Sequence, residues 1–245
     1  MSLESMVIFG LHRSGSTVHS ITELACGVPI DLGVLLSPTH TAVLTMELQR
    51  GVMGDLAVLP QLAAEARARD IVAHAARLAD GARRAGVPVV HCTAEHRPDG
   101  AGSPVNSPIM AALAQGPPRL VAGSPSVEVV PELGPEPGDF VSSRLHGVSP
   151  FTGTSLDMLL RSLGVKTVVA TGVSVNIALI GLAIEAVNLG YSVAIATDAV
   201  AGVPPDYADA VMIHTLALLA TRVTVDNVLK TWDEAAGTDR GTDRR

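Results

Sequence analysis

One stretch of the chain, residues 166–203, constrains the fold more than any other. It begins with Thr167–Thr171, a short run rich in β-branched residues that is typical of a buried strand. After a break at Gly172, apolar residues recur at helical spacing over Val175–Leu189, and Tyr191–Ala196 is a second apolar run. Because a helix of this length joins two apolar strands, we expect the strands to be parallel and covered on both faces.

The rest of the chain follows the same alternation of strands and helices. Further strands are predicted at Ala42–Met46, Pro88–Cys92, Phe140–Ser143 and Arg222–Thr224. Helices are predicted at Ala63–Ala85, Ile109–Ala114, Ser126–Val130, Ser155–Leu163, Asp206–Ala220 and Asp226–Ala235. Asp198 is expected at a turn after its strand. Since parallel sheets bind ligands at the carboxyl ends of their strands, the site is expected at the turn Gly172–Asn176.

Three segments follow one family pattern in the same order and at similar spacing. Residues 172–178 read G-V-S-V-N-I-A, Ala42–Gln49 reads A-V-L-T-M-E-L-Q, and Phe151–Asp157 reads F-T-G-T-S-L-D. They resemble the G-V-x-T-N-x-C, A-L-L-V-I-D-M-Q and F-x-G-T-x-L-D segments of the isochorismatase-like hydrolases, or cysteine hydrolases. The resemblance covers about Pro38 to Val228. It implies an α/β fold: a three-layer, Rossmann-like domain with a six-stranded, mostly parallel sheet.

The family's catalytic set is an aspartate, a lysine and a cysteine, and this sequence departs from it at each position. The resemblance puts Glu47 at the carboxylate position, where it suits a general acid or base; a structural salt bridge is the alternative. The lysine position falls near Arg144, although an ungapped match gives Leu145, and a solvated arginine is the alternative. The nucleophile position is Ala178, which excludes the usual thioester mechanism there because that mechanism needs a thiolate.

Residues near these positions are candidates for binding a substrate. The resemblance implies an oxyanion hole at the turn, with a cis peptide bond between Val173 and Ser174. Ser174 is a substitute nucleophile or an ordinary turn serine, while His146 and Phe151 line the pocket or simply pack in their loop. The full set of predicted substrate-binding residues is Gln49, His91, His146, Phe151, Val173, Ser174 and Asn176.

His91 and Cys92 end the second predicted strand, and adjacent strand residues face opposite sides, so they cannot pair with each other. Cys92 is either a relocated nucleophile or a small buried hydrophobe. Nicotinamidases of the family hold a metal just beyond this strand, where the matching positions here are Glu95 and Arg97. Because arginine does not ligate metals, we predict no metal site and no cofactor.

Charge, cysteine content and the apolar stretches indicate which partners and which location to expect. A formal net charge of −7 with scattered basic residues argues against nucleic-acid binding. Two cysteines form no disulfide framework, and no signal peptide pattern begins the chain, so we expect a cytoplasmic location. Polar residues interrupt the apolar stretch 168–183, which favours a buried strand and helix over a membrane segment. The expected partners are a small molecule and, as in the family, further copies in a homodimer or homotetramer.

The predicted organisation is an N-terminal arm (1–37), one hydrolase domain (38–236) and a disordered tail (237–245). Within the arm, Arg13–Thr17 reads R-S-G-S-T and resembles the phosphate-cradling loop of sulfotransferases. Nothing downstream supports a nucleotide site, which favours an arm that packs on the body or on a neighbouring subunit. Hydrophobic residues make up 47% of the chain and aromatic ones 2%, so the core must be aliphatic.

Three functions are compatible with these residues. The first is a hydrolase of a small, anionic molecule that uses Glu47 as acid and Arg144 as anchor, without a cysteine nucleophile. The second is an inactive family member that binds a ligand or acts as a scaffold. The third is an amidase whose nucleophile has moved to Cys92 or Ser174.

Overall fold

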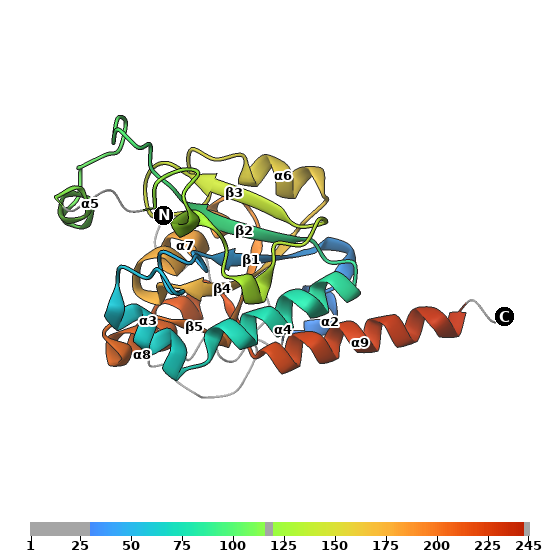
Figure 1. The fold of residues 1–245 in the computed structure, drawn as a ribbon. Coiled ribbons are helices and arrows are strands. Elements are labelled where there is room, and N and C mark those ends of the chain that lie inside the picture. Colours follow the sequence, from blue (N-terminus) through green and yellow to red (C-terminus); the bar gives the residue numbers. More distant parts are fainter. Residues whose placement is uncertain (1–29, 116–119, 243–245) are drawn as a thin grey trace, which may run out of the picture.

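The chain is built around one parallel sheet (Figure 1). The structure, a computed structural model, describes residues 30–115 and 120–242. Six strands lie in the order β3-β2-β1-β4-β5-β6, and every pairing is parallel. The strands are β1 (Thr41–Met46), β2 (Val89–Ala94), β3 (Phe140–Arg144), β4 (Thr167–Val173), β5 (Ser192–Ala201) and β6 (Thr221–Val223). The α/β fold predicted from the sequence is confirmed.

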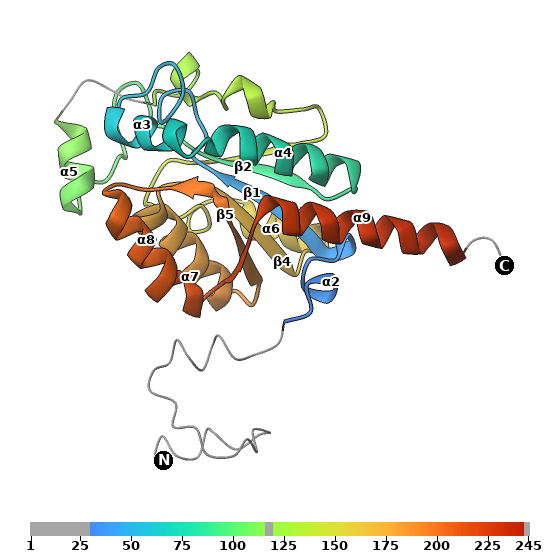
Figure 2. The same ribbon diagram turned by 90° about the horizontal axis from the view of Figure 1, so that it is seen from below.

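Helices cover both faces of the sheet and make the fold three-layered (Figure 2). The α-helices are α2 (Leu32–Leu35), α3 (Pro60–Ala68), α4 (Ile71–Arg84), α5 (Pro108–Ala114), α6 (Leu156–Ser162), α7 (Ile180–Asn188), α8 (Pro205–His214) and α9 (Val225–Thr242). Short helical turns lie at Pro38–His40, Pro125–Val127, Pro131–Leu133, Val175–Leu179 and Leu216–Leu218. Helices α3, α4 and α9 cover one face, and α6, α7 and α8 cover the other.

Alternation along the strands divides the aliphatic core between the two faces. In β1, Leu44 packs in the cluster that includes residues of α6, α7 and α8, whereas Val43 packs with Leu78 of α4 and Trp232 of α9. Every residue of β1, β2 and β4 is buried. Strands covered on both faces can be apolar throughout, which explains the continuous aliphatic runs in the sequence.

Several predicted elements differ in extent from the observed ones. The helix predicted at Ala63–Ala85 is divided into α3 and α4 at Asp70, whose φ of 52° is left-handed and does not continue an α-helix. The helix predicted at Asp206–Ala220 likewise separates into α8 and the turn Leu216–Leu218. At Ser126–Val130 no α-helix forms, because Val129 instead pairs as an isolated bridge with Gln49.

Two C-terminal elements are longer than predicted. β5 continues to Ala201, so Asp198 lies within the strand, where its carboxylate accepts a hydrogen bond from Val225 N at 2.9 Å. This contact satisfies a free N–H at the start of α9. α9 itself runs to Thr242, and the tail boundary predicted at Gly237 falls inside it (Figure 1). Once the first turns are fixed on the body, each further residue adds a helical hydrogen bond at low cost.

The strand order changes direction between β1 and β4, which is where sheets of this type form a ligand crevice. These two strands approach closely at their carboxyl ends. Gly172 has a φ of 108°, and a Cβ on it would lie 2.1 Å from Met46 O. Only glycine fits there, so the sequence itself allows the two strands to meet at the edge where the site lies.

The end of the predicted N-terminal arm packs on the body. Leu36 is fully buried, and its carbonyl accepts a hydrogen bond from Trp232 Nε1 at 2.8 Å. The R-S-G-S-T segment lies outside the described residues. In the part of the chain that the structure describes, no helix has both the length and the apolarity needed to cross a membrane.

Candidate active site

Glu47 stands directly after β1, at the carboxyl edge of the sheet. Its backbone leaves the strand with a left-handed φ of 52°, while its N–H still donates to Cys92 O at 2.9 Å. The carboxylate accepts a charged hydrogen bond from Nη2 of Arg144, the last residue of β3. β3 and β1 are separated by β2, so this ion pair spans three strands at one edge of the sheet.

Arg144 is buried, with 8% of its side chain exposed, yet one of its donors has no partner. Nε donates to Gly147 O at 3.2 Å and Nη2 to Glu47, whereas Nη1 makes no hydrogen bond within the described chain. An unpaired buried donor is costly, so Nη1 is an open place for an acceptor. Leu145, the alternative at this position, is 41% exposed, whereas Arg144 is buried. The structure therefore brings Arg144, not Leu145, to Glu47.

The turn after β4 forms the other side of the site. The Val173–Ser174 peptide bond is cis, as predicted from the family resemblance. A π-helix follows over Val175–Leu179 in place of a first α-helical turn, and Ala178 lies within it. Ala178 is 3% exposed and belongs to the same hydrophobic cluster as Cys92. A methyl side chain in this place contributes packing and no reactive group.

Asn176 fastens this turn to the segment after β5. Its Nδ2 donates to Val203 O at 3.1 Å, and its Oδ1 is buried without a partner among the described residues. The fit is tight, since a Cβ on Gly202 would lie 2.8 Å from Oδ1. Asn176 thus has one hydrogen bond for structure and one free acceptor.

Cys92 lies beside the ion pair, but its thiol is not activated. The side chain is 1% exposed, and this burial raises the pKa of the thiol to about 12, against a smaller lowering by Arg144. A thiol with this pKa is protonated at neutral pH and is a poor nucleophile. The geometry therefore favours the small buried hydrophobe over the relocated nucleophile.

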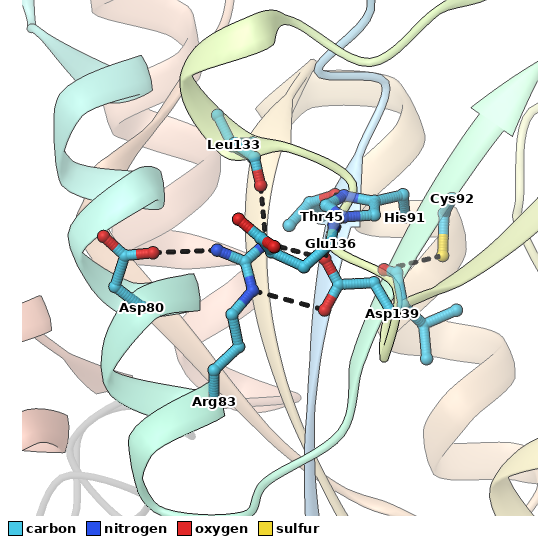
Figure 3. A network of polar contacts seen from close by, with 9 residues as sticks. Thr45, Asp80, Arg83, His91, Cys92, Leu133, Glu136 and Asp139 are labelled. Carbon is cyan, nitrogen blue, oxygen red and sulfur yellow. Dashed lines mark hydrogen bonds and ion pairs between the residues drawn. The ribbon is translucent and has the colours of Figure 1, made fainter.

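His91, one of the predicted substrate-binding residues, belongs to a buried polar network with Thr45, Asp139 and Arg83 (Figure 3). It is fully buried, with Nδ1 2.8 Å from Thr45 Oγ1 and Nε2 3.2 Å from the Asp139 carboxylate. Asp139 also binds Arg83 of α4 at 2.6 Å. Burial lowers the pKa of His91 more than Asp139 raises it. Side-chain alternation along β2 puts His91 on the α4 face, opposite to Cys92.

Gln49 and Phe151, two further predicted substrate-binding residues, make extensive contacts within the fold. Gln49 is fully buried; its Nε2 donates to Ala94 O and Val127 O, both at 2.9 Å, and its Oε1 accepts from Ala94 N at 2.8 Å. These bonds use its donors to join β2 to the segment before Val130. Phe151 is 5% exposed and stacks on Tyr191 in the core, with ring centroids 6.0 Å apart.

His146, in contrast, stays near the site. It is exposed and lines a cavity of about 210 Å³, together with Arg97, Ala101, Gly102, Ser103 and Leu145. This cavity lies just beyond the end of β3 that carries Arg144. No three His, Cys, Asp or Glu side chains gather closely enough to hold a metal ion within residues 30–115 and 120–242.

Comparison with known proteins identifies the family of this chain. The isochorismatase domain matches residues 41–227. The chain belongs to the isochorismatase family. The ureidoacrylate amidohydrolase of Rhizobium rhizogenes is 26% identical over 219 residues, 84% of this chain and 89% of that protein. Two solved structures are similar: an isochorismatase family protein from Burkholderia thailandensis (29% identity, TM-score 0.66, 80% of this chain and 97% of that one) and N-carbamoylsarcosine amidase from Thermoplasma acidophilum (28%, 0.60, 76% and 97%).

The sequence analysis of this isochorismatase-family protein missed Glu185 on α7. The carboxylate accepts hydrogen bonds from Ser149 Oγ at 2.5 Å, Thr152 Oγ1 at 2.6 Å and Thr152 N at 3.1 Å. Both partners lie in the loop that follows Arg144. A signal was present, because Glu185 is the only charged residue between Lys166 and Asp198. A lone carboxylate in so apolar a stretch needs a partner.

The site of this isochorismatase-family member thus combines a carboxylate, a guanidinium with one free donor, and a turn with a free amide acceptor. The guanidinium can hold an anionic group in a fixed orientation. The carboxylate can accept or donate a proton next to it.

Proposed function

We propose that this isochorismatase-family hydrolase acts on a small, anionic molecule by acid catalysis, without a cysteine nucleophile. Glu47 is the proton donor and Arg144 binds the anionic group of the substrate. The observation that carries the proposal is the buried Nη1 of Arg144 beside Glu47, which has no partner within residues 30–115 and 120–242. A carboxylate-bearing ligand would supply the missing acceptor, and its binding would offset the cost of the orphaned donor.

The ion pair places the proposed proton donor beside the proposed anion-binding group. Glu47 accepts a hydrogen bond from Arg144 Nη2, so a substrate anion held at Nη1 of Arg144 would lie close to the Glu47 carboxyl group. In the proposed reaction the carboxylic acid of Glu47 donates its proton to the leaving group, and water supplies the hydroxyl that completes the hydrolysis. The Glu47 carboxylate then takes up a proton from solvent.

The residues at the remaining positions support a mechanism without a covalent intermediate. Ala178, at the position where the resemblance expects the nucleophile, carries no lone pair to attack a substrate. Cys92 is held as a thiol by burial, which raises its pKa to about 12. These two facts argue against the amidase with a relocated cysteine. A small-molecule substrate, a homodimer or homotetramer and a cytoplasmic location complete the proposal.

A second function is favoured by the same alanine: a protein that binds an anionic ligand at Arg144 and does not turn it over. Such a protein would need the anion-binding pair of Arg144 and Glu47 but no nucleophile, and alanine stands at the nucleophile position here. The two functions share a site and differ only in whether a bond is cleaved.

The test is hydrolysis of a panel of small amides, ureas, esters and vinyl ethers, each with and without a carboxylate. It includes ureidoacrylate and N-carbamoylsarcosine, which two relatives' names specify. We expect turnover of carboxylate-bearing compounds only, and a loss of about 10²- to 10³-fold in Glu47→Gln. Glu65→Gln, which removes a partly buried carboxylate that also pairs with an arginine, Arg69, is the matched control and retains activity. Absence of turnover with binding of the same carboxylates would favour the second function.

A further inference from the structure

The loop between β3 and α6 contacts the Arg144 guanidinium through one backbone carbonyl. Arg144 Nε donates to Gly147 O at 3.2 Å, inside this loop. A guanidinium is planar, so fixing Nε also fixes the plane in which Nη1 and Nη2 point. Movement of Gly147 would therefore change the direction of the free donor and of the bond to Glu47.

The same loop is fastened to α7 by Glu185. Its carboxylate accepts three hydrogen bonds, from Ser149 Oγ, Thr152 Oγ1 and Thr152 N. Burial raises the pKa of Glu185, but the hydrogen bonds from Ser149 and Thr152 outweigh this effect and leave it below its ordinary value. The carboxylate is therefore ionised, and each bond to it is charge-assisted. The loop also lies tightly on α7, since a Cβ on Gly181 would be 3.3 Å from Ser149 Cβ.

We infer that Glu185 is a positioning residue for the site: it clamps the loop 147–152 onto α7 so that Gly147 O holds Arg144 in place for Glu47 and the substrate anion. The inference rests on the proposed function, because Arg144 is the group being positioned. Glu185 joins the two sides of the crevice, since α7 continues from the turn after β4 and the loop continues from β3. Neither Glu185 nor its loop partners need touch the substrate.

A first test needs no substrate and uses the unfolding equilibrium of the full chain in urea. Four proteins are compared: the wild type, Glu185→Gln, Glu47→Gln and the double variant. We expect Glu185→Gln to raise the unfolding constant about tenfold in the wild type and about threefold in Glu47→Gln. The second effect is smaller because the ion pair that the clamp supports is already lost. If Glu185→Gln does not fold, Thr152→Val, which removes one donor from an exposed loop residue, replaces it.

A matched control is Asp209→Asn in the same cycle with Glu47→Gln. Asp209 on α8 also accepts two side-chain hydrogen bonds, both from Arg69 at the end of α3, and its partner lies outside the loop 147–152. Its effect should multiply with that of Glu47→Gln, as expected for independent sites. If the effects of Glu185→Gln multiply in the same way, Glu185 is only a structural residue and the inference is overturned.

A second test uses the compound that the panel identifies. Glu185→Gln should raise KM about fivefold with kcat within about twofold of the wild type, because Arg144 anchors the substrate. In an Arg144→Met background the same change should leave KM unaffected. An equal rise of KM in both backgrounds would contradict the inference. If the wild type turns over nothing, the proposed function fails, while the unfolding cycle still decides whether Glu185 is coupled to the ion pair of Arg144 and Glu47.

Discussion

Two arginine–carboxylate pairs of this protein differ in what they leave unpaired. On the α4 face, Asp139 is 3% exposed and binds Arg83 Nη2 at 2.6 Å, Glu136 N at 2.8 Å and His91 Nε2 at 3.2 Å (Figure 3). At the carboxyl edge, Arg144 binds Glu47 and Gly147, but its buried Nη1 has no partner among the residues that the structure describes.

The difference separates a structural network from a candidate binding site. A buried polar network that is fully satisfied rigidifies the fold and has nothing left to offer a ligand. A buried donor without a partner destabilises the unliganded protein. A ligand that supplies the acceptor removes this cost, and its binding is strengthened accordingly. Burial and charge alone would rank the two pairs equally; only the count of satisfied atoms distinguishes them.

The largest effect is expected when the pair of Arg83 and Asp139, whose polar atoms are all satisfied, is broken. Arg83→Met leaves the Asp139 carboxylate buried without its cation, and we expect the free energy of unfolding to fall by about 3 kcal/mol. Urea unfolding measures this loss. Turnover per folded molecule should stay near that of the wild type, because Arg83 lies on the α4 face. A stable Arg83→Met protein with lost activity would reverse the roles that we give to the two pairs.

The matched change at the pair of Arg144 and Glu47 is Arg144→Met. It removes an unsatisfied donor along with the ion pair, and Glu47 keeps some contact with solvent at 17% exposure. We therefore expect a smaller change in unfolding free energy, about 1 kcal/mol, and a fall in kcat/KM of about 10²-fold for carboxylate substrates. Steady-state kinetics and urea unfolding are measured on the same preparation. An unfolding cost as large as that of Arg83→Met would contradict the comparison.

The network of His91, Asp139 and Arg83 also predicts that the folded protein loses stability in acid. Burial lowers the pKa of His91 in the folded protein, so its contribution is fully present above its ordinary pKa near 6.5 and is lost as the pH falls toward the lowered value. Asp139, whose pKa is also lowered, adds a second loss below about pH 4.

From pH 7.5 to pH 5, we expect the free energy of unfolding to drop by about 1 kcal/mol through His91. His91→Gln should flatten this part of the curve, whereas His214→Gln, on the exposed end of α8, should not. A curve that keeps its slope in His91→Gln would show that another group titrates.

The smallest effect is expected at Cys92, which separates the proposed acid mechanism from a cysteine amidase. Because burial raises the thiol pKa to about 12, Cys92→Ala should change turnover less than about twofold. Iodoacetamide should label Cys92 in the folded protein far more slowly than in urea, as followed by mass spectrometry of the peptide that contains it. Rapid native labelling with loss of activity would reinstate Cys92 as nucleophile.

Local patterns predicted some elements well and others poorly. Thr167–Thr171 and Ala42–Met46 were predicted as buried strands because β-branched, apolar runs carry their own signal, and both are confirmed. The single helix expected over Ala63–Ala85 is instead interrupted at Asp70, which has a left-handed φ. The pattern of apolar residues carries no sign of this interruption. The candidate site shows the same limit: position along the chain identified Glu47 and Arg144, but it did not reveal the buried hydrogen bonds of Gln49 and His91 or the stacking of Phe151 on Tyr191.

The sequence by itself determined the family, the alternation of strands and helices, and the residue types at the carboxyl edge. These properties depend on neighbours along the chain, where spacing and side-chain chemistry are directly visible. The tertiary structure decided which polar groups are satisfied: it paired Arg144 with Glu47, closed the network around Asp139, and brought Glu185 to the loop of Ser149. Hydrogen-bond satisfaction depends on contacts between distant segments, so no local pattern can reveal the free donor that marks the site.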